Sequence, residues 1–187
     1  MDKQSEILKA ALKLFVEFGF HGTPTSKIAQ EAGVANGTLF HYYKTKDDLI
    51  VALYVDIKTR LGGCMYGAID ESMSYEETLK TIFNETLTWA LANKMEFNFI
   101  QQFHTSPFIS LLSKEEIAKQ AQHHLEIIAK GIKKKHLKDL PVELLYTLIT
   151  SHTFGIYQFI ASSDFSGAKQ KKLINESFEL IWKMIKQ

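Results

Sequence analysis

The stretch IAQEAGVANGTLFHYYKTKDDL, which runs from Ile28 to Leu49, decides how this chain folds. It places a tight turn, Gly33-Val34, between two short helical patterns. Four ring-bearing residues then follow one another at positions 40–43. Because successive side chains on an α-helix point about 100° apart, these four cannot all face one core. Some of them therefore face outward, where a partner can meet them.

The residues before this stretch begin the same unit. Apolar residues recur at spacings of three and four from Ile7 to Phe18, which predicts an amphipathic helix that Gly19 ends. Thr23 is expected to cap the second helix, with Thr25 as the alternative. Two short helices joined by a tight turn and braced by a longer helix form a helix-turn-helix unit. Such a unit places its second helix in a major groove of DNA.

The rest of the chain keeps a helical pattern. A fourth helix is predicted from Lys46 to about Gly62, with acidic residues in its first turn. Five further helices are predicted near residues 75–93, 95–104, 114–136, 142–162 and 168–186, separated by polar, proline or glycine breaks. Only three prolines interrupt the chain. We therefore expect an all-α protein of about nine helices.

Composition restricts the classes of function. The 187 residues carry 22 lysines and arginines against 21 acidic residues, and residues 1–60 hold 8 against 7. The net charge therefore does not indicate nucleic-acid binding. A DNA-binding protein of this composition has to use a few specifically positioned polar or basic side chains. No apolar run reaches the length of a membrane span, so no membrane partner is expected. The single cysteine, Cys64, fits a reducing cytoplasm, and we expect it to be buried as a small apolar residue.

Enzyme signatures are missing from the sequence. None of the seven histidines follows an acidic residue at the spacing of a Glu-x-x-His metal pair, and no glycine-rich phosphate loop occurs. His123 and His124 are adjacent, so on a helix they point about 100° apart and make a poor joint metal site. We therefore expect no catalytic residue, no metal and no cofactor.

Residues 7–53 resemble the tetracycline-repressor-like (TetR) family of bacterial transcription regulators. LFVEFGFHGT at the end of the first helix and the stretch quoted above carry the resemblance. It implies a homodimeric all-α protein with a helix-turn-helix DNA-binding domain at 1–46 and a helical effector-binding and dimerisation domain at 47–187. It also implies a cytoplasmic repressor that binds a palindromic double-stranded DNA operator and is released by a small-molecule effector.

The resemblance, carried over by position, implies which residues meet DNA. Side chains at the start of the second and fourth helices would bind phosphates, and the third helix would face the DNA. These residues are Thr25, Ser26, Asn36, Gly37, Thr38, His41, Tyr42 and Lys46.

The chain departs from the family pattern at three positions. Phe40 stands where a tyrosine hydroxyl usually reaches a phosphate, Ala35 replaces the usual serine cap, and Pro24 replaces a common hydroxyl cap. Capping is expected to shift to Asn36, which either caps the third helix or reads an adenine. Phe40 and the weak positive charge also keep an alternative class open, a helical small-molecule-binding protein with degenerate DNA contacts.

The remaining two thirds of the chain are rich in aromatic residues. Most of these are expected to form ordinary core, but some would suit a mostly apolar pocket for an apolar or aromatic effector. The residues expected to line it are Tyr66, Trp89, Phe99, Gln102, Phe103, His104, Phe154 and Tyr157. The fourth helix would then act as a rigid lever of roughly 25 Å between this pocket and DNA.

By resemblance, the last two helices pair with their copies in a four-helix dimer interface. The residues expected in that interface are Leu148, Ser151, Gly155, Phe159, Phe178 and Trp182. The alternative is that both helices only close the core of their own protomer.

Overall fold

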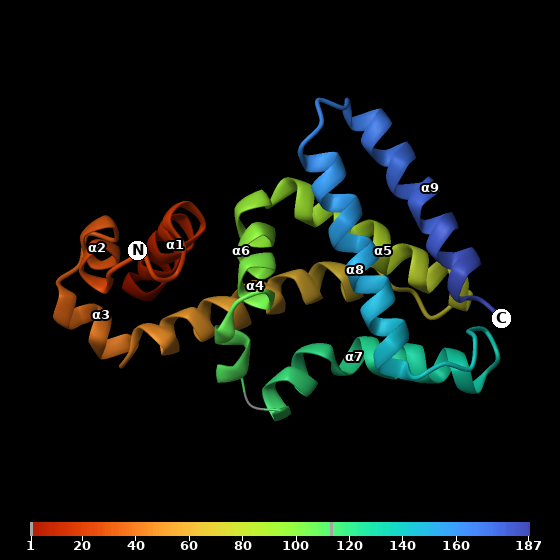
Figure 1. The fold of residues 1–187 in the computed structure, drawn as a ribbon, viewed down its shortest axis with the longest axis horizontal. Helices are drawn as coiled ribbons and strands as arrows, with labels where there is room; N and C mark the ends of the chain where they lie inside the picture. The colour runs from red at the N-terminus through yellow and green to blue at the C-terminus, as the bar shows by residue number, and fades with distance from the viewer. Residues whose placement is uncertain (1, 113) are drawn as a thin grey trace. The chain divides into compact units, whose positions relative to one another are not determined.

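The computed structural model describes residues 2–112 and 114–187, without the side chains of residues 114–118 and 120. Within these residues the chain forms nine α-helices, one short 3-10 helix and no β-strand, which confirms the predicted all-α class (Figure 1). The helices are α1 (Lys3–Phe18), α2 (Thr25–Glu31), α3 (Asn36–Tyr42), α4 (Lys46–Gly67), α5 (Tyr75–Ala92), α6 (Lys94–His104), η1 (Pro107–Leu111), α7 (Lys114–Lys133), α8 (Val142–Ala161) and α9 (Gly167–Ile185).

Two helix ends differ from the predicted ones. α4 continues past Gly62 to Gly67, because its buried face runs from Leu61, before the glycines, to Met65 beyond them. α7 ends at Lys133 rather than at residue 136, since Lys135 adopts a left-handed backbone conformation with φ of 59°. A residue in that conformation cannot continue a right-handed helix.

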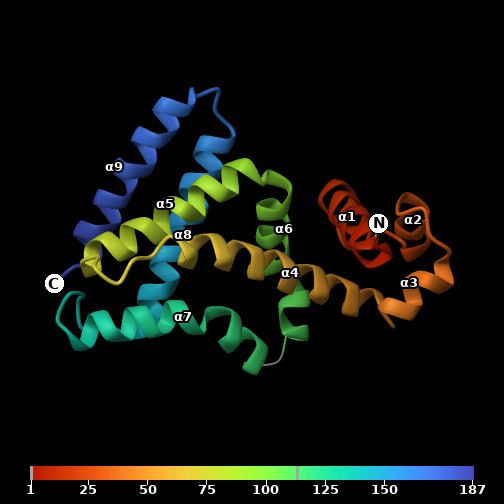
Figure 2. The same cartoon turned by 180° about the vertical axis from the view of Figure 1, so that it is seen from behind.

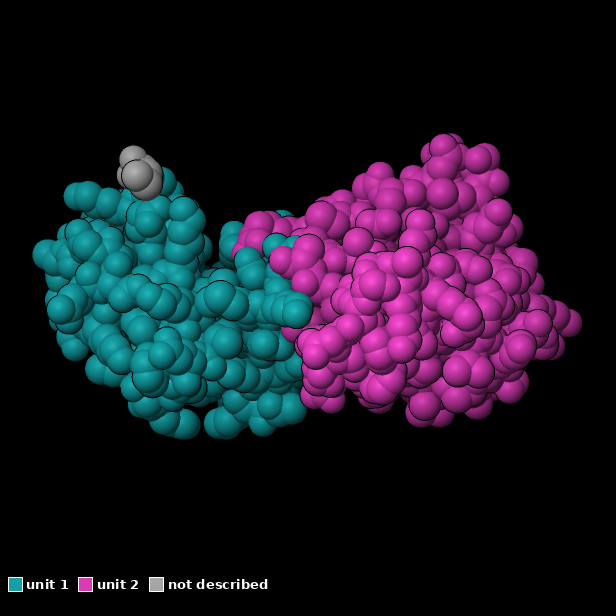
Figure 3. Space-filling view, turned by 90° about the horizontal axis from the view of Figure 1, so that it is seen from above, with its two compact units in different colours: residues 1–59, 93–117 teal, residues 60–92, 118–187 magenta. Residues whose placement is uncertain are grey.

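The chain divides into two compact units (Figure 3). Unit 1 comprises residues 1–59 and 93–117, and unit 2 comprises residues 60–92 and 118–187. α4 therefore contributes to both units. These units do not follow the expected boundary between residues 46 and 47, because α6 packs against α1 and joins unit 1. A functional division after residue 46 stays a prediction.

An aromatic core holds unit 1 together. The Phe15 ring lies 5.4 Å from that of Phe20 and 6.3 Å from that of Phe99, between centroids. Phe103 stacks on Tyr54 at 4.1 Å. Helices α1, α4 and α6 thus share one core, and α2 and α3 pack beside α1, with α3 leading into α4 (Figure 2).

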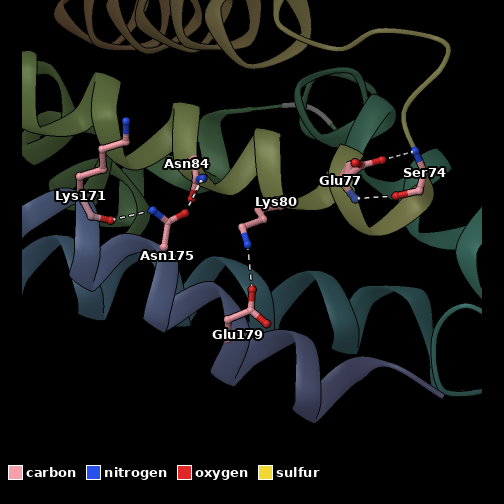
Figure 4. Close-up of polar contacts among 7 residues, drawn as sticks. All are labelled: Ser74, Glu77, Lys80, Asn84, Lys171, Asn175 and Glu179. Atoms are coloured by element: carbon pink, nitrogen blue, oxygen red, sulfur yellow. Dashed lines mark hydrogen bonds and ion pairs between the residues drawn. The ribbon is translucent and has the colours of Figure 1, made fainter.

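In unit 2, α5 packs against α8 and α9. Its start is fixed by a capping box, in which the Ser74 N–H donates to Glu77 Oε2 at 2.8 Å and the Glu77 N–H donates to Ser74 Oγ at 3.2 Å (Figure 4). Farther along, Phe83 contacts Phe178, which stacks on Trp182. This part of α9 therefore belongs to the core of this chain.

Polar pairs join α5 to α9 beside that core (Figure 4). Lys80 Nζ lies 2.8 Å from Glu179 Oε1. One turn away, Asn84 Nδ2 donates to Asn175 Oδ1 at 3.2 Å, and Asn175 Nδ2 donates to the Lys171 carbonyl at 3.0 Å. Directional bonds of this kind fix the register of two helices more sharply than apolar packing alone.

Two further features bear on function. Cys64 is exposed on α4, contrary to the expected buried role, because the buried face there runs through Leu61 and Met65 beside it. None of the helices in the described part of the chain has the length and apolar character to cross a membrane.

Candidate DNA-binding surface

The turn between α2 and α3 is a Schellman motif, which fixes how the two helices meet. The Gly33 N–H donates to the Gln30 carbonyl at 3.1 Å, and the Val34 N–H donates to the Ala29 carbonyl at 3.0 Å. The motif needs a residue with positive φ after the helix, and Gly33 supplies it at 66°. Leu39 of α3 is fully buried, so the third helix is held against the rest of unit 1 by its inner face.

The predicted cap of α2 is wrong. Thr23 is completely buried, and its hydroxyl donates to the carbonyls of Leu14 at 3.0 Å and Gly19 at 2.8 Å. It therefore ties the following loop to the end of α1. Thr25, the alternative cap, is the first residue of the helix, and Pro24 occupies the cap position with no side-chain bond.

The predicted cap of α3 is wrong as well. Ala35 keeps the N-cap position with an extended backbone, and Asn36 is the first helical residue with no capping bond. Asn36 is exposed, so its amide is directed away from the core. Base recognition by Asn36 stays a prediction.

Three of the four consecutive ring-bearing residues face outward, as their spacing requires. Phe40, His41 and Tyr42 are exposed, with 40% of the Tyr42 surface accessible, whereas Tyr43 keeps only 6%. The His41 and Tyr42 rings meet edge to face at 5.6 Å. Tyr43 ends α3, and its N–H donates to the Leu39 carbonyl at 2.9 Å.

A capping box that the sequence analysis missed positions Lys46. The Asp48 N–H donates to Thr45 Oγ1 at 3.0 Å, and the Thr45 N–H donates to Asp48 Oδ2 at 2.9 Å. The Thr-x-x-Asp spacing was the available signal. Lys46, the first residue of α4, is half-buried, and that burial lowers the pKa of its ammonium while Asp47 opposes the shift.

All eight residues predicted to meet DNA lie in unit 1, on α2, on α3 and at the start of α4. Ser26, Asn36, Gly37, His41 and Tyr42 are exposed, and Thr25, Thr38 and Lys46 are half-buried. The side chains supply hydroxyl, amide, imidazole and ammonium groups, which serve as hydrogen-bond donors to phosphates and base edges.

The eight residues predicted to line an effector pocket fall into two groups. Phe99, Gln102, Phe103 and His104 belong to unit 1, and Tyr66, Trp89, Phe154 and Tyr157 belong to unit 2. Phe99 and Phe103 are fully buried in the aromatic core, and Tyr157 is nearly so. Their role in a pocket stays a prediction.

His104 belongs to a polar group within unit 1. Its Nε2 hydrogen-bonds to the Tyr54 hydroxyl at 3.2 Å. Burial, and then the positive charge of Lys58, lower the pKa of His104 from 6.5 to about 4. The residue as a whole keeps exposed surface, so solvent moderates this shift. Because its pKa is lowered, the His104 imidazole is neutral at pH 7.

A second polar group lies in unit 2. The Tyr66 hydroxyl hydrogen-bonds to His124 Nδ1, and the His123 ring meets the Tyr66 ring edge to face at 4.2 Å. Burial, followed by the nearby Tyr146 hydroxyl, raises the pKa of Tyr66. Tyr146 was not predicted, because its place in α8 follows no motif of a ligand site. Among the described residues, no group of three or more histidine, cysteine or acidic residues is arranged to hold a metal ion.

The predicted dimer residues separate by exposure. Leu148 is half-buried, and Ser151, Gly155 and Phe159 are exposed along one side of α8, with 54% of the Phe159 surface accessible. Phe178 and Trp182 are instead buried within the chain itself. The large exposed apolar residues of α9 are Leu180, at 64%, and Met184, neither of which was predicted for the interface.

Comparison with known proteins now identifies the class. Residues 7–53 match the model of bacterial regulatory proteins of the tetR family, and residues 54–187 match the tetracyclin repressor-like C-terminal domain. The chain belongs to the tetR family of transcriptional regulators, which confirms the resemblance found in the sequence.

Several relatives carry regulator names. The chain is 29% identical over 129 residues to the fatty acid metabolism regulator protein of Bacillus subtilis (strain 168), covering 69% of this chain but only 61% of that protein. It is 23% identical over 160 residues to the transcriptional repressor KstR2 of Mycolicibacterium smegmatis, covering 81% and 76%. The crystal structure of a tetR family transcription regulator from Shewanella sp. PV-4 superposes with a TM-score of 0.92 at 28% identity, over the full length of both chains.

Proposed function

We propose that this regulator represses transcription from a palindromic operator, which it binds as a homodimer and leaves when a small apolar or aromatic effector binds. The observation that carries the proposal is the outward face of α3, where His41 and Tyr42 are exposed next to the capped start of α4 at Lys46. We propose that the protein acts in the cytoplasm and performs no catalysis, in keeping with relatives that are named regulators.

DNA binding would divide between phosphates and bases. Lys46 stands at a helix start, where unpaired N–H groups and the helix dipole favour an anion. Thr25 and Ser26 open α2 in the same way. Thr38 and Asn36 on α3 would contact base edges, because hydroxyl and amide groups discriminate bases in the major groove.

Dimerisation would use the exposed side of α8 and α9. Leu144, Phe159, Leu180 and Met184 are large apolar residues that each protomer leaves accessible. Ser151 and Gly155 are small and exposed beside them, so a second helix can approach closely. A dimer of helix-turn-helix units would present its two reading helices to half-sites about 34–36 Å apart, or a multiple of that.

The effector would be apolar or aromatic. Tyr66 and His124 in unit 2 pair a few polar atoms with aromatic surroundings, the composition expected of a ligand site. The name of the B. subtilis relative, a regulator of fatty acid metabolism, supports an apolar ligand. α4 would carry the response, because its 22 residues run without a break for roughly 33 Å and contribute to both units.

Fluorescence anisotropy on the DNA upstream of the gene, against a scrambled duplex, tests this function. Lys46→Ala should weaken binding to both duplexes and reduce the salt slope by about 1, because one phosphate contact is lost. Thr38→Ala should instead change which operator variants are preferred. Lys172→Ala, an exposed lysine of α9, serves as the control and should change neither. A Lys46→Ala protein altered only in sequence preference would contradict the assignment.

The second candidate is a helical small-molecule-binding protein with degenerate DNA contacts. Phe40 favours it, because 37% of the residue's surface is exposed at a position where a hydroxyl would serve a phosphate better. Equal, weak and salt-sensitive binding to every duplex, together with a measurable effector affinity, would favour this candidate over a repressor.

A further inference from the structure

Unit 1 contains a groove that the proposed function does not use. It has a volume of about 570 Å³, within the range of small-molecule sites. It is lined by Gln4 and Leu8 of α1, by Tyr43 after α3, by Asp47, Asp48, Val51, Ala52, Val55 and Asp56 of α4, and by Leu111 of η1. None of the residues predicted for the effector pocket belongs to it.

The lining of this groove is apolar along its length and acidic around it. Leu8, Val51 and Val55 supply apolar surface, and both Leu8 and the valines remain partly accessible. Three lining residues are aspartates, and neither lysine nor arginine lines the groove. Its charge therefore disfavours an anionic ligand inside the groove and favours a cation.

One buried side chain that lines this groove has an unpaired polar atom. Tyr43 lines it and is more than nine-tenths buried, yet its hydroxyl has no hydrogen-bond partner. The Gln4 side chain lies nearby, but without the geometry of a normal hydrogen bond. Buried hydroxyls without a partner are uncommon because they lose their bonds to water.

We propose that the groove between α1 and α4 binds a small organic cation, an ammonium or amidinium group carried on an apolar or aromatic body. The aspartates attract the charged group, the valines and Leu8 accept the apolar body, and the Tyr43 hydroxyl gains a donor. A bare metal ion fits less well, because no cluster of ligating residues in the described chain is arranged to hold one. The groove shares no residue with the predicted effector pocket. A failed binding test at the groove therefore leaves the proposed effector response standing, and a failed effector test leaves the groove standing.

The test uses the whole 187-residue chain with 4-phenylbutylammonium as the probe, and it measures methyl chemical shifts. Two compounds of the same size, 4-phenylbutan-1-ol and 4-phenylbutyrate, separate charge from apolar contact. We expect shifts at Leu8, Val51 and Val55 with the ammonium, weaker ones with the alcohol and none with the carboxylate. Ala52→Phe fills the groove and should abolish binding.

A charge variant keeps the proposal testable should Ala52→Phe fail to fold. Asp47 is exposed, so Asp47→Asn preserves the structure and should weaken binding roughly fivefold, the effect of one charge about 4 Å away in water. Asp139→Asn, an exposed acidic residue of unit 2, is the matched control and should leave binding unchanged.

The proposal is overturned by any of three results. One is ammonium and alcohol binding with equal affinity, since the charge would then play no part. The second is a folded Ala52→Phe protein that binds as well as the parent. The third is the absence of methyl shifts at the groove when the ammonium is present at millimolar concentration.

Discussion

Replacing Gly33 with alanine isolates the backbone cost of the turn between α2 and α3. Gly33 has φ of 66°, and a methyl group added there would contact nothing within 4 Å. The new side chain therefore causes no clash, and only the left-handed conformation is penalised. For an L-residue that penalty is about 1–2 kcal/mol, so we expect the free energy of unfolding of unit 1 to fall by that amount.

Two further variants separate conformation from composition. Gly33→Asn should cost less than Gly33→Ala, because asparagine enters the left-handed region more readily. Gly37→Ala is the matched control, since Gly37 is equally open but lies in α3 with a negative φ. It should stabilise the helix by about 0.5–1 kcal/mol.

The assay has to report on unit 1. Both tryptophans, Trp89 and Trp182, lie in unit 2, so their fluorescence would follow the wrong part of the chain. Amide hydrogen exchange at the buried residues Ile28 and Leu39 follows the right one. A Gly33→Ala protein that is as stable as the parent, or more stable than Gly33→Asn, would refute the conformational argument.

Three other predictions follow from the packing and the titratable groups. A methyl group at Gly131 would overlap the Tyr75 hydroxyl, so Gly131→Ala should destabilise unit 2 by about 1–3 kcal/mol in urea unfolding. Gly63→Ala is the control, because a methyl group there meets no neighbour and should not destabilise the unit. Thr23→Val keeps the side-chain shape but removes the donor to two carbonyls, so calorimetry should show a loss of about 1–2 kcal/mol, and no loss would contradict those bonds. The folded pKa of His104, about 4, lies below its ordinary value of 6.5, so the unfolded chain binds the proton first and stability should fall as pH drops from 6.5 towards 4. His104→Gln should flatten this part of the stability profile, and an unchanged profile would exclude His104 as its source.

Much of unit 1 could be predicted from the sequence, because local patterns determine it. The spacing of apolar residues from Ile7 to Phe18 predicted α1. Gly33 predicted the turn, which forms a Schellman motif in the structure. The predicted cap of α2 was wrong because of a tertiary contact. Thr23 has the residue type of a cap, but its hydroxyl is taken by the end of α1, a contact that no local rule contains.

The division of aromatic residues could not be predicted. Phe99 and Trp89 look alike by periodicity, yet Phe99 packs against Phe15 in unit 1 and Trp89 belongs to unit 2. In α9, apolar residues occur on more than one side of the helix. Only packing shows that Phe178 is buried and that Leu180 is accessible.

The capping box at the start of α4 bears on how this regulator would search a chromosome. It holds Asp48 beside Lys46, with Asp47 between them, so a phosphate arriving there meets two negative charges with one positive charge. Residence on DNA of arbitrary sequence grows with the number of phosphates that a protein neutralises. Sparse phosphate contacts of this kind would shorten each encounter with a wrong site, and the proposed hydrogen bonds of α3 would then decide recognition. Few molecules would then be sequestered along the chromosome, and a small number of copies would keep the operator occupied.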